Sequence, residues 1–132
     1  MVLVDSNIIF DLWDRDPVWA KWSAQQLRTV SVRHDLIIDA VIYAEVSVRY
    51  SSQMMLDRAL DELGLNLLDI PRDAAFLAGK AYRQYRRRGG TKSNVLPDFF
   101  IGAHAVVLSC SLLTRDTRAY TTYFPSVRLI AP

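Results

Sequence analysis

The first nine residues constrain the fold of this 132-residue chain more than any other stretch. Met1–Val4 is an apolar run without a polar residue, which predicts a strand buried on both faces at the centre of a parallel sheet. The run ends abruptly at Asp5-Ser6-Asn7, and apolar residues return at Ile8 and Ile9. Ligands of open α/β sheets bind at the carboxyl ends of the strands. Asp5 is therefore either the N-cap of a helix or the first member of a charged site.

Short apolar runs alternate with longer helical patterns along the whole chain. We expect strands at 1–4, 36–38, 66–70, 111–114 and 127–130, and helices at 8–13, 18–30, 39–51, 53–63, 71–88, 95–108 and 119–123. This alternation is typical of a parallel sheet covered by helices on both faces. The predicted fold class is therefore α/β, with three α/β/α layers around a five-stranded parallel sheet and a single domain over 1–132.

The cysteine count, the first residues and the longest apolar run argue against several classes of protein. A single cysteine, Cys110, forms no internal disulfide, and the first residues lack the pattern of a signal peptide, so we expect a cytoplasmic protein. The nearly apolar run 95–113 contains Pro97, Asp98 and His104, so it predicts a buried helix and a strand and no membrane partner. His104 is expected to be a core or interface histidine. No dinucleotide or P-loop motif is present.

The basic residues are unusual in kind and in position. The net charge is only +2, but thirteen of the sixteen basic residues are arginines, which suit bidentate phosphate contacts. Four of them end the helix predicted at 71–88: Arg83, Arg86, Arg87 and Arg88. Cations stabilise the carboxyl end of a helix, which explains part of this cluster, and a phosphate-contacting surface is the second interpretation. A polar loop at 89–94 follows and is expected to be mobile.

Four acidic residues occupy places where a carboxylate is hard to explain as a simple surface group. Asp5 and Asp116 follow the first and fourth predicted strands, Glu45 lies in a mostly apolar helix, and Asp98 opens the most hydrophobic helix. An i,i+4 pair with Arg49 is the alternative explanation for Glu45. If the four acids converge at the carboxyl edge of the sheet, their repulsion requires a cation. Oxygen ligands favour Mg²⁺ or Mn²⁺, which activate water for attack on phosphate esters.

These segments, in this order, resemble the motifs of PIN-domain ribonucleases and, more narrowly, of VapC toxins from bacterial and archaeal toxin–antitoxin pairs. The resemblance rests on Val4-Asp5-Ser6-Asn7, the lone helical Glu45, the LPDFFIGA segment at 96–103, and Leu113-Thr114-Arg115-Asp116 followed by Tyr123-Phe124-Pro125. It implies a metal-dependent endoribonuclease that hydrolyses RNA with Mg²⁺ or Mn²⁺. It also implies a homodimer and a VapB-type antitoxin whose tail covers the cleft.

The resemblance assigns roles to individual residues. It implies that Asp5, Asp98 and Asp116 hold the metal ion and that Glu45 completes the cage or orients the attacking water. Ser6, Asn7 and Thr114 match positions that support these acids. Candidates for contacts with the RNA backbone are Arg115, Arg83, Arg86, Arg87, Arg88 and Lys92. Some PIN domains carry a further acid shortly after the last one, whereas 117–120 contain none here.

Three other functions are alternatives to this one. A haloacid-dehalogenase-like phosphatase needs a second Asp two residues after Asp5, where this chain has Asn7. A receiver-like signalling domain needs a paired acid near Asp5 and a strand-end lysine, and neither is evident. The remaining alternative is a non-catalytic PIN-like module that binds RNA without a metal. The presence of all four acids argues against it, and restoring Mg²⁺ or Mn²⁺ after EDTA would separate the two.

Overall fold

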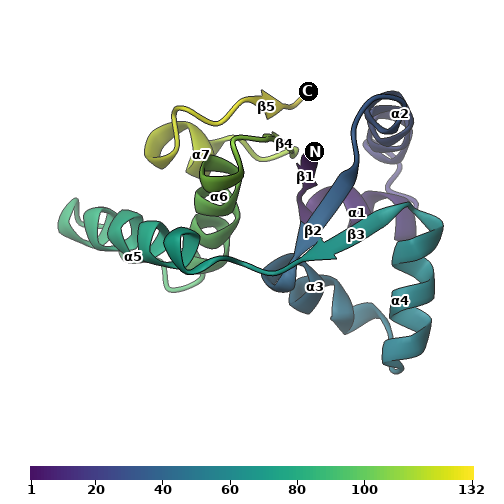
Figure 1. Ribbon diagram of the computed structural model, residues 1–132, viewed down its shortest axis with the longest axis horizontal. Helices are drawn as coiled ribbons and strands as arrows, with labels where there is room; N and C mark the ends of the chain where they lie inside the picture. Colours follow the sequence, from purple (N-terminus) through teal and green to yellow (C-terminus); the bar gives the residue numbers. More distant parts are fainter.

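The computed structural model describes all residues from 1 to 132 (Figure 1). Its five strands form one all-parallel sheet in the order β3-β2-β1-β4-β5. The strands are β1 Val2–Val4, β2 Leu36–Asp39, β3 Leu65–Leu68, β4 Ser111–Leu113 and β5 Leu129–Ile130. Every residue of β1 is buried and β1 occupies the middle of the sheet, so the prediction made for the first residues is confirmed.

Helices cover both faces of the sheet, which confirms the predicted three-layer α/β/α fold. They are α1 Ser6–Trp13, α2 Ala20–Ser31, α3 Ala40–Val46, α4 Gln53–Glu62, α5 Arg72–Arg87, α6 Leu96–Leu108 and α7 Arg118–Tyr123. Figure 1 shows α1, α2 and α4 on one side of the strands and α5, α6 and α7 on the other. Right-handed crossovers produce this division, because the chain steps outward from β1 to β3 and then returns to β4 and β5. No helix is both long and apolar enough to cross a membrane.

Helix α6 contains more buried residues than any other helix, in line with its apolar sequence. It packs along α5 and against α7. Gly102 makes the contact with α7 possible, because a Cβ atom at this position would lie 2.3 Å from the ring of Phe124. Asp98 lies in the first turn of α6.

The helix predicted at 39–51 is shorter and less buried than expected. It ends at Val46, and a 3₁₀ turn, η1 Ser47–Arg49, follows it. Ala44 and Val48 are exposed. The reason is that the residues of α3 packed against α1 and α6 occupy one face only, so the apolar pattern overstated the burial of the other. The strands predicted at 66–70 and 127–130 are also shorter, at Leu65–Leu68 and Leu129–Ile130.

Candidate active site

The pairing of β1 with β4 brings residues from opposite ends of the chain together. Val4 pairs with Leu113 in parallel register, and the Asp5 backbone N–H donates to the Leu113 carbonyl at 2.9 Å. Both strands end at this point, so Asp5 lies beside Thr114, and Asp116 follows two residues later. The sheet register therefore explains why the first and fourth strands both deliver an acid to the same edge.

Asp5 is both the N-cap of α1 and the centre of a hydrogen-bond cluster. Its Oδ1 accepts from the Ser6 backbone N–H at 2.8 Å. Its Oδ2 accepts from the Thr114 hydroxyl at 2.8 Å and from the Tyr120 hydroxyl at 2.9 Å. The Asn7 amide lies 3.3 Å from the same oxygen. The two interpretations of Asp5 from the sequence are thus compatible, and the side chains predicted to support it do contact it.

Asp116 lies in the exposed loop between β4 and α7. Its backbone N–H donates to the Thr114 hydroxyl oxygen at 3.1 Å, and its Oδ1 accepts from the Arg118 backbone N–H at 3.1 Å. The Asn7 side-chain oxygen accepts from the Arg115 backbone N–H at 3.2 Å. The loop is therefore bonded to the same Asn7 and Thr114 side chains that contact Asp5.

Glu45 comes from α3 and has no cation as a partner. Its Oε1 is buried and makes no hydrogen bond. The predicted alternative, a pair between Glu45 and Arg49, is wrong. Arg49 instead binds Asp14 at 2.8 Å, and its guanidinium carbon lies 4.7 Å from the centre of the Phe10 ring. Arg49 lies in the 3₁₀ turn that follows α3 and not in the helix itself, so the i,i+4 spacing of an α-helix does not apply to it.

The acids are close enough for their charges to raise the pKa of Asp5, Glu45 and Asp98. Burial, followed by the charges of Asp5 and Asp98, raises the pKa of Glu45 to about 7. Burial, followed by the charges of Asp5 and Asp116, raises the pKa of Asp98 to about 6. The pKa of Asp5 is raised mainly by burial, while the Thr114 and Tyr120 hydroxyls oppose that rise. The four acids singled out in the sequence thus form one cluster, whose catalytic role remains a prediction.

Tyr120 belongs to this cluster and was not predicted from the sequence. It comes from α7, is buried, and donates its hydroxyl to Asp5. Its own pKa is strongly raised by burial and by the charges of the neighbouring acids, so it stays protonated as a donor. The only signal in the sequence is its place one helical turn after Asp116.

Asp39 and His104 form a second polar contact, behind the site. Asp39 is the N-cap of α3, and its Oδ1 accepts from the N–H groups of Val41 and Ile42 at 3.0 Å each. Its Oδ2 lies 3.0 Å from His104 Nδ1, and both side chains are fully buried. His104 is therefore a core histidine, as expected. Because it belongs to α6, this contact joins the helices that carry Glu45 and Asp98.

The side chains do not form a complete metal cage in this structure. No three of the His, Cys, Asp or Glu side chains are arranged so that they could share one ion. The cage predicted from Asp5, Asp98 and Asp116 is therefore not confirmed. Hydrogen bonds engage both oxygens of Asp5, and repulsion between like charges favours separation of neighbouring carboxylates.

A pocket of about 350 Å³ opens beside Asp98 and Asp116. Its walls also include the aromatic rings of Tyr85 and Tyr123 and the basic side chains of Lys92 and Arg118. The Lys92 backbone N–H donates to the Tyr85 hydroxyl at 2.8 Å, which fixes this point of the loop at 89–94. Cationic side chains bind phosphates and aromatic rings stack on bases, and the pocket places both kinds of group beside the acids.

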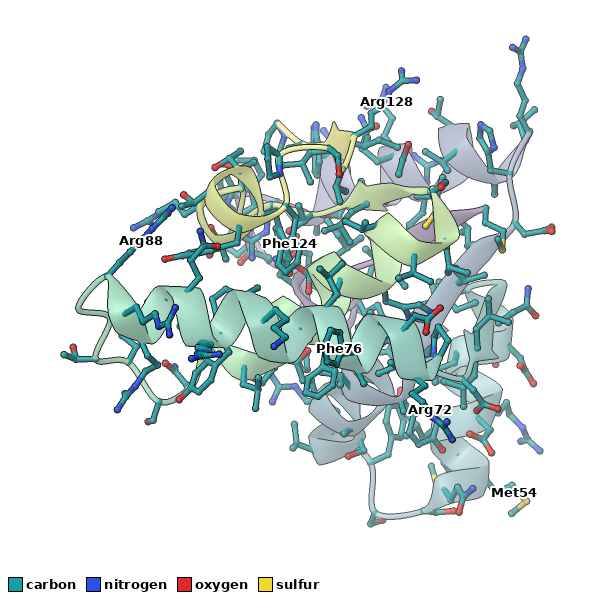
Figure 2. All side chains as sticks on the ribbon, turned by 60° about the vertical axis from the view of Figure 1, so that its left-hand side comes forward. Met54, Arg72, Phe76, Arg88, Phe124 and Arg128 are labelled. Atoms are coloured by element: carbon teal, nitrogen blue, oxygen red, sulfur yellow. The ribbon has the colours of Figure 1, made fainter.

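The predicted RNA-contacting residues lie in three different places. Arg83, Arg86 and Arg87 are exposed on α5. Arg88 lies where α5 ends, beside α7, as Figure 2 shows, and its guanidinium carbon is 5.7 Å from the centre of the Tyr123 ring. Lys92 lines the pocket, together with Arg118, a cation that the sequence did not single out. Arg115 points elsewhere and binds Asp11 through two hydrogen bonds, at 2.7 and 2.8 Å.

The fold and the site together define a class of α/β protein: an all-parallel sheet of order 3-2-1-4-5 with an acidic cluster at its carboxyl edge. The family model of the PIN domain matches residues 2–125, and the chain belongs to the PIN domain family. PIN domains are typically nucleases and generally use divalent metal ions.

Solved structures with the same fold come from toxin–antitoxin complexes. A chain in the crystal structure of VapBC2 from Rickettsia felis, bound to a DNA fragment from its promoter, is 18% identical with a TM-score of 0.74, over 99% of this chain and 98% of that one. A chain in a toxin–antitoxin complex from Klebsiella pneumoniae is 25% identical with a TM-score of 0.71, over 96% of this chain and 95% of that one. A chain in the crystal structure of FitAcB from Neisseria gonorrhoeae is 20% identical with a TM-score of 0.71, over 98% of this chain and 96% of that one. No protein of curated function matches the chain.

Proposed function

We propose that this chain is the toxin of a type II toxin–antitoxin pair, a VapC-like endoribonuclease that hydrolyses RNA with Mg²⁺ or Mn²⁺. One observation carries the proposal. Asp5, Glu45, Asp98 and Asp116 gather at the carboxyl edge of a PIN-domain sheet, where burial and the charges of neighbouring acids raise the pKa of Asp5, Glu45 and Asp98. Such a cluster favours a cation, because a bound cation offsets the repulsion that otherwise leads to protonation.

The donor groups fit a hard divalent ion in their chemistry. All are carboxylate oxygens, which Mg²⁺ and Mn²⁺ prefer, and Glu45 Oε1 is buried without a partner. We assign Asp5, Asp98 and Asp116 as the residues that would hold the ion, with Glu45 beside them. When bound, such an ion polarises the phosphodiester and lowers the pKa of water.

The chain's own residues would orient the reactants and move the proton. Thr114 and Tyr120 fix the orientation of Asp5 through their hydroxyls. Glu45, with its pKa near 7, is suited to take a proton from the attacking water at neutral pH. Water then attacks phosphorus in line, the bond from phosphorus to the 3′ oxygen breaks, and that oxygen takes a proton from solvent, leaving a 5′-phosphate and a 3′-hydroxyl. Lys92, Arg88 and Arg118 would contact the RNA backbone beside the pocket.

A cleavage assay on end-labelled RNA tests this function. We expect cleavage with Mg²⁺ or Mn²⁺, no cleavage in EDTA, and recovery when the ion is restored. Asp98→Asn and Glu45→Gln should each abolish cleavage, while Glu62→Gln, an exposed glutamate changed in the same way, should retain it. Retained activity in both Asp5→Asn and Asp98→Asn would defeat the assignment. RNA binding without cleavage in either metal would instead indicate a non-catalytic RNA-binding module.

The partners follow from the same proposal. Because similar folds are found in toxin–antitoxin complexes, we propose a VapB-type antitoxin whose tail covers the pocket beside Asp98 and Asp116. We also propose a homodimer and a cytoplasmic site of action, where RNA is available. Light scattering after size exclusion should give twice the chain mass of 15.0 kDa. A mass of one chain would contradict the homodimer, and growth arrest that no co-expressed VapB-type protein relieves would contradict the antitoxin.

A further inference from the structure

A buried carboxylate on α1, Asp11, lies outside the acidic cluster and is fully engaged. Its Oδ2 accepts from the Ser23 hydroxyl at 2.6 Å and from Arg115 Nε at 2.7 Å. Its Oδ1 accepts from Arg115 Nη2 at 2.8 Å, and the residue is only 2% exposed. The contact with Arg115 is therefore bidentate, which is the strongest geometry for an arginine–carboxylate pair.

Arg115 is the residue between Thr114 and Asp116, and it is fixed at both of its ends. Its backbone N–H donates to Asn7, and its guanidinium binds Asp11 one helical turn further along α1. The guanidinium carbon also lies 5.3 Å from the centre of the Trp19 ring. Helix α1 thus holds the loop between β4 and α7 at two points, immediately before Asp116.

The carboxylate of Asp116 has little to hold it in place. It is exposed, and the carboxylate accepts only from the backbone N–H of Arg118, at the start of α7. Its charge repels those of Asp5 and Asp98, which favours an outward movement of the loop. Two hydrogen bonds between the Thr114 hydroxyl and the Asp116 backbone oppose that movement, and so does the attachment of Arg115 to α1.

We propose that Arg115 is a positioning residue, which through its bidentate pair with Asp11 holds Asp116 at the acidic cluster, and that it does not contact RNA. This inference rests on the proposed function, because Asp116 needs positioning only if the cluster is an active site. It replaces the role in RNA binding that the sequence predicted for Arg115.

Asp11→Asn separates positioning from RNA binding. This variant weakens the pair but leaves the positive charge of Arg115 free. If Arg115 binds RNA, releasing it should preserve or strengthen RNA binding and cleavage. If Arg115 positions Asp116, we expect Asp11→Asn and Arg115→Ala each to lower kcat by about 10- to 100-fold at unchanged RNA affinity, because small misplacements of reacting groups have effects of this size.

Three further variants sharpen the comparison. The double variant Asp11→Asn/Arg115→Ala should be no slower than the slower single variant, because both remove one interaction. Arg115→Lys keeps the charge and loses the bidentate geometry, so kcat should fall with RNA affinity unchanged. Ser23→Ala is the matched control: it removes a different hydrogen bond from Asp11 and should leave kcat unchanged.

The experiment measures kcat on labelled RNA, RNA affinity by fluorescence anisotropy in EDTA, and amide hydrogen exchange of Asp116 by NMR. Exchange of this amide, which donates to Thr114, should be faster in Asp11→Asn, Arg115→Ala and Arg115→Lys and unchanged in Ser23→Ala. Unchanged exchange, or loss of RNA affinity with normal kcat, would overturn the inference. If the unmodified chain cleaves no RNA, the proposed function fails, while the exchange data still test the attachment of the loop. Arg115→Lys serves if the other variants do not fold.

Discussion

At the scale of single residues, Asp5 shows how one carboxylate serves structure and site at once. Its Oδ1 caps α1, while its Oδ2 accepts hydroxyl hydrogen bonds from Thr114 and Tyr120. Burial alone would favour the neutral acid, and the two hydroxyls favour the charged form. The hydroxyls of Thr114, just after β4, and of Tyr120, in α7, thus offset part of the cost of burying this carboxylate.

Tyr120→Phe tests this description. Removing the hydroxyl leaves Asp5 Oδ2 with one donor fewer in a buried setting, so the free energy of unfolding should fall by about 1–2 kcal/mol. Urea unfolding at pH 8 measures the change. Tyr123→Phe is the matched control, because the Tyr123 hydroxyl makes no hydrogen bond within the chain and its loss should have little effect. Equal losses in the two variants would show that the bond to Asp5 contributes nothing.

At the scale of elements, the site depends on how α3 and α6 are held together. Asp39 caps α3 and contacts His104 of α6, and both are fully buried. His104→Leu keeps most of the side-chain volume but leaves one oxygen of Asp39 unpaired. The free energy of unfolding should therefore fall by roughly 1–3 kcal/mol, the cost of a buried unsatisfied polar group. Thermal unfolding measures this, and an unchanged midpoint would mean that Asp39 is satisfied without His104.

The contact between α6 and α7 can be tested with two glycines. A Cβ at Gly102 would meet the Phe124 ring at 2.3 Å, whereas a Cβ at Gly79 of α5 meets nothing within 4 Å. Gly102→Ala should lower stability by about 1–3 kcal/mol through overpacking. Gly79→Ala should raise it by roughly 0.5–1 kcal/mol, because alanine is the better helix former. Chemical denaturation measures the free energy of unfolding of both variants. A change of the same sign in both would contradict this packing of Gly102 against Phe124.

At the scale of the whole molecule, the acidic cluster makes stability depend on pH. In the folded chain the pKa of Glu45 is raised from 4.5 to about 7 and that of Asp98 from 3.8 to about 6. At a pH between the ordinary and the raised pKa values, the folded chain binds more protons than the unfolded chain, so the free energy of unfolding falls as the pH rises. The penalty is absent below about pH 4 and complete above about pH 7.

Unfolding of the metal-free chain in EDTA, measured at several values between pH 4 and 8, checks this dependence. We expect stability to fall less with pH in Glu45→Gln than in the unmodified chain, and Glu62→Gln to behave like the unmodified chain. Adding Mg²⁺ or Mn²⁺ at pH 8 should raise the unfolding midpoint, because an ion that binds only the folded state stabilises it. An identical pH dependence in Glu45→Gln and Glu62→Gln would show that burial and neighbouring charges do not act on Glu45.

The local pattern of the sequence determined the strands, most of the helices and the list of four acids. Apolar runs such as Met1–Val4 and the abrupt change at Asp5 depend on neighbouring residues only, so they can be interpreted without a structure. The same applies to Asp98 at the start of an apolar helix. The parallel sheet followed from the alternation of strands and helices, and its carboxyl edge indicated where Asp5 and Asp116 would meet.

Only the tertiary structure decided which polar partner each side chain takes. Tyr120 reaches Asp5 across 115 positions of sequence, Arg115 reaches Asp11 across 104, and Arg49 reaches Asp14 across 35. A charged side chain has many partners of opposite sign in the chain, and local spacing does not choose among them. The choice follows from the packing of α1, α3 and α7 around the sheet, which sets the few donors and acceptors within hydrogen-bond distance.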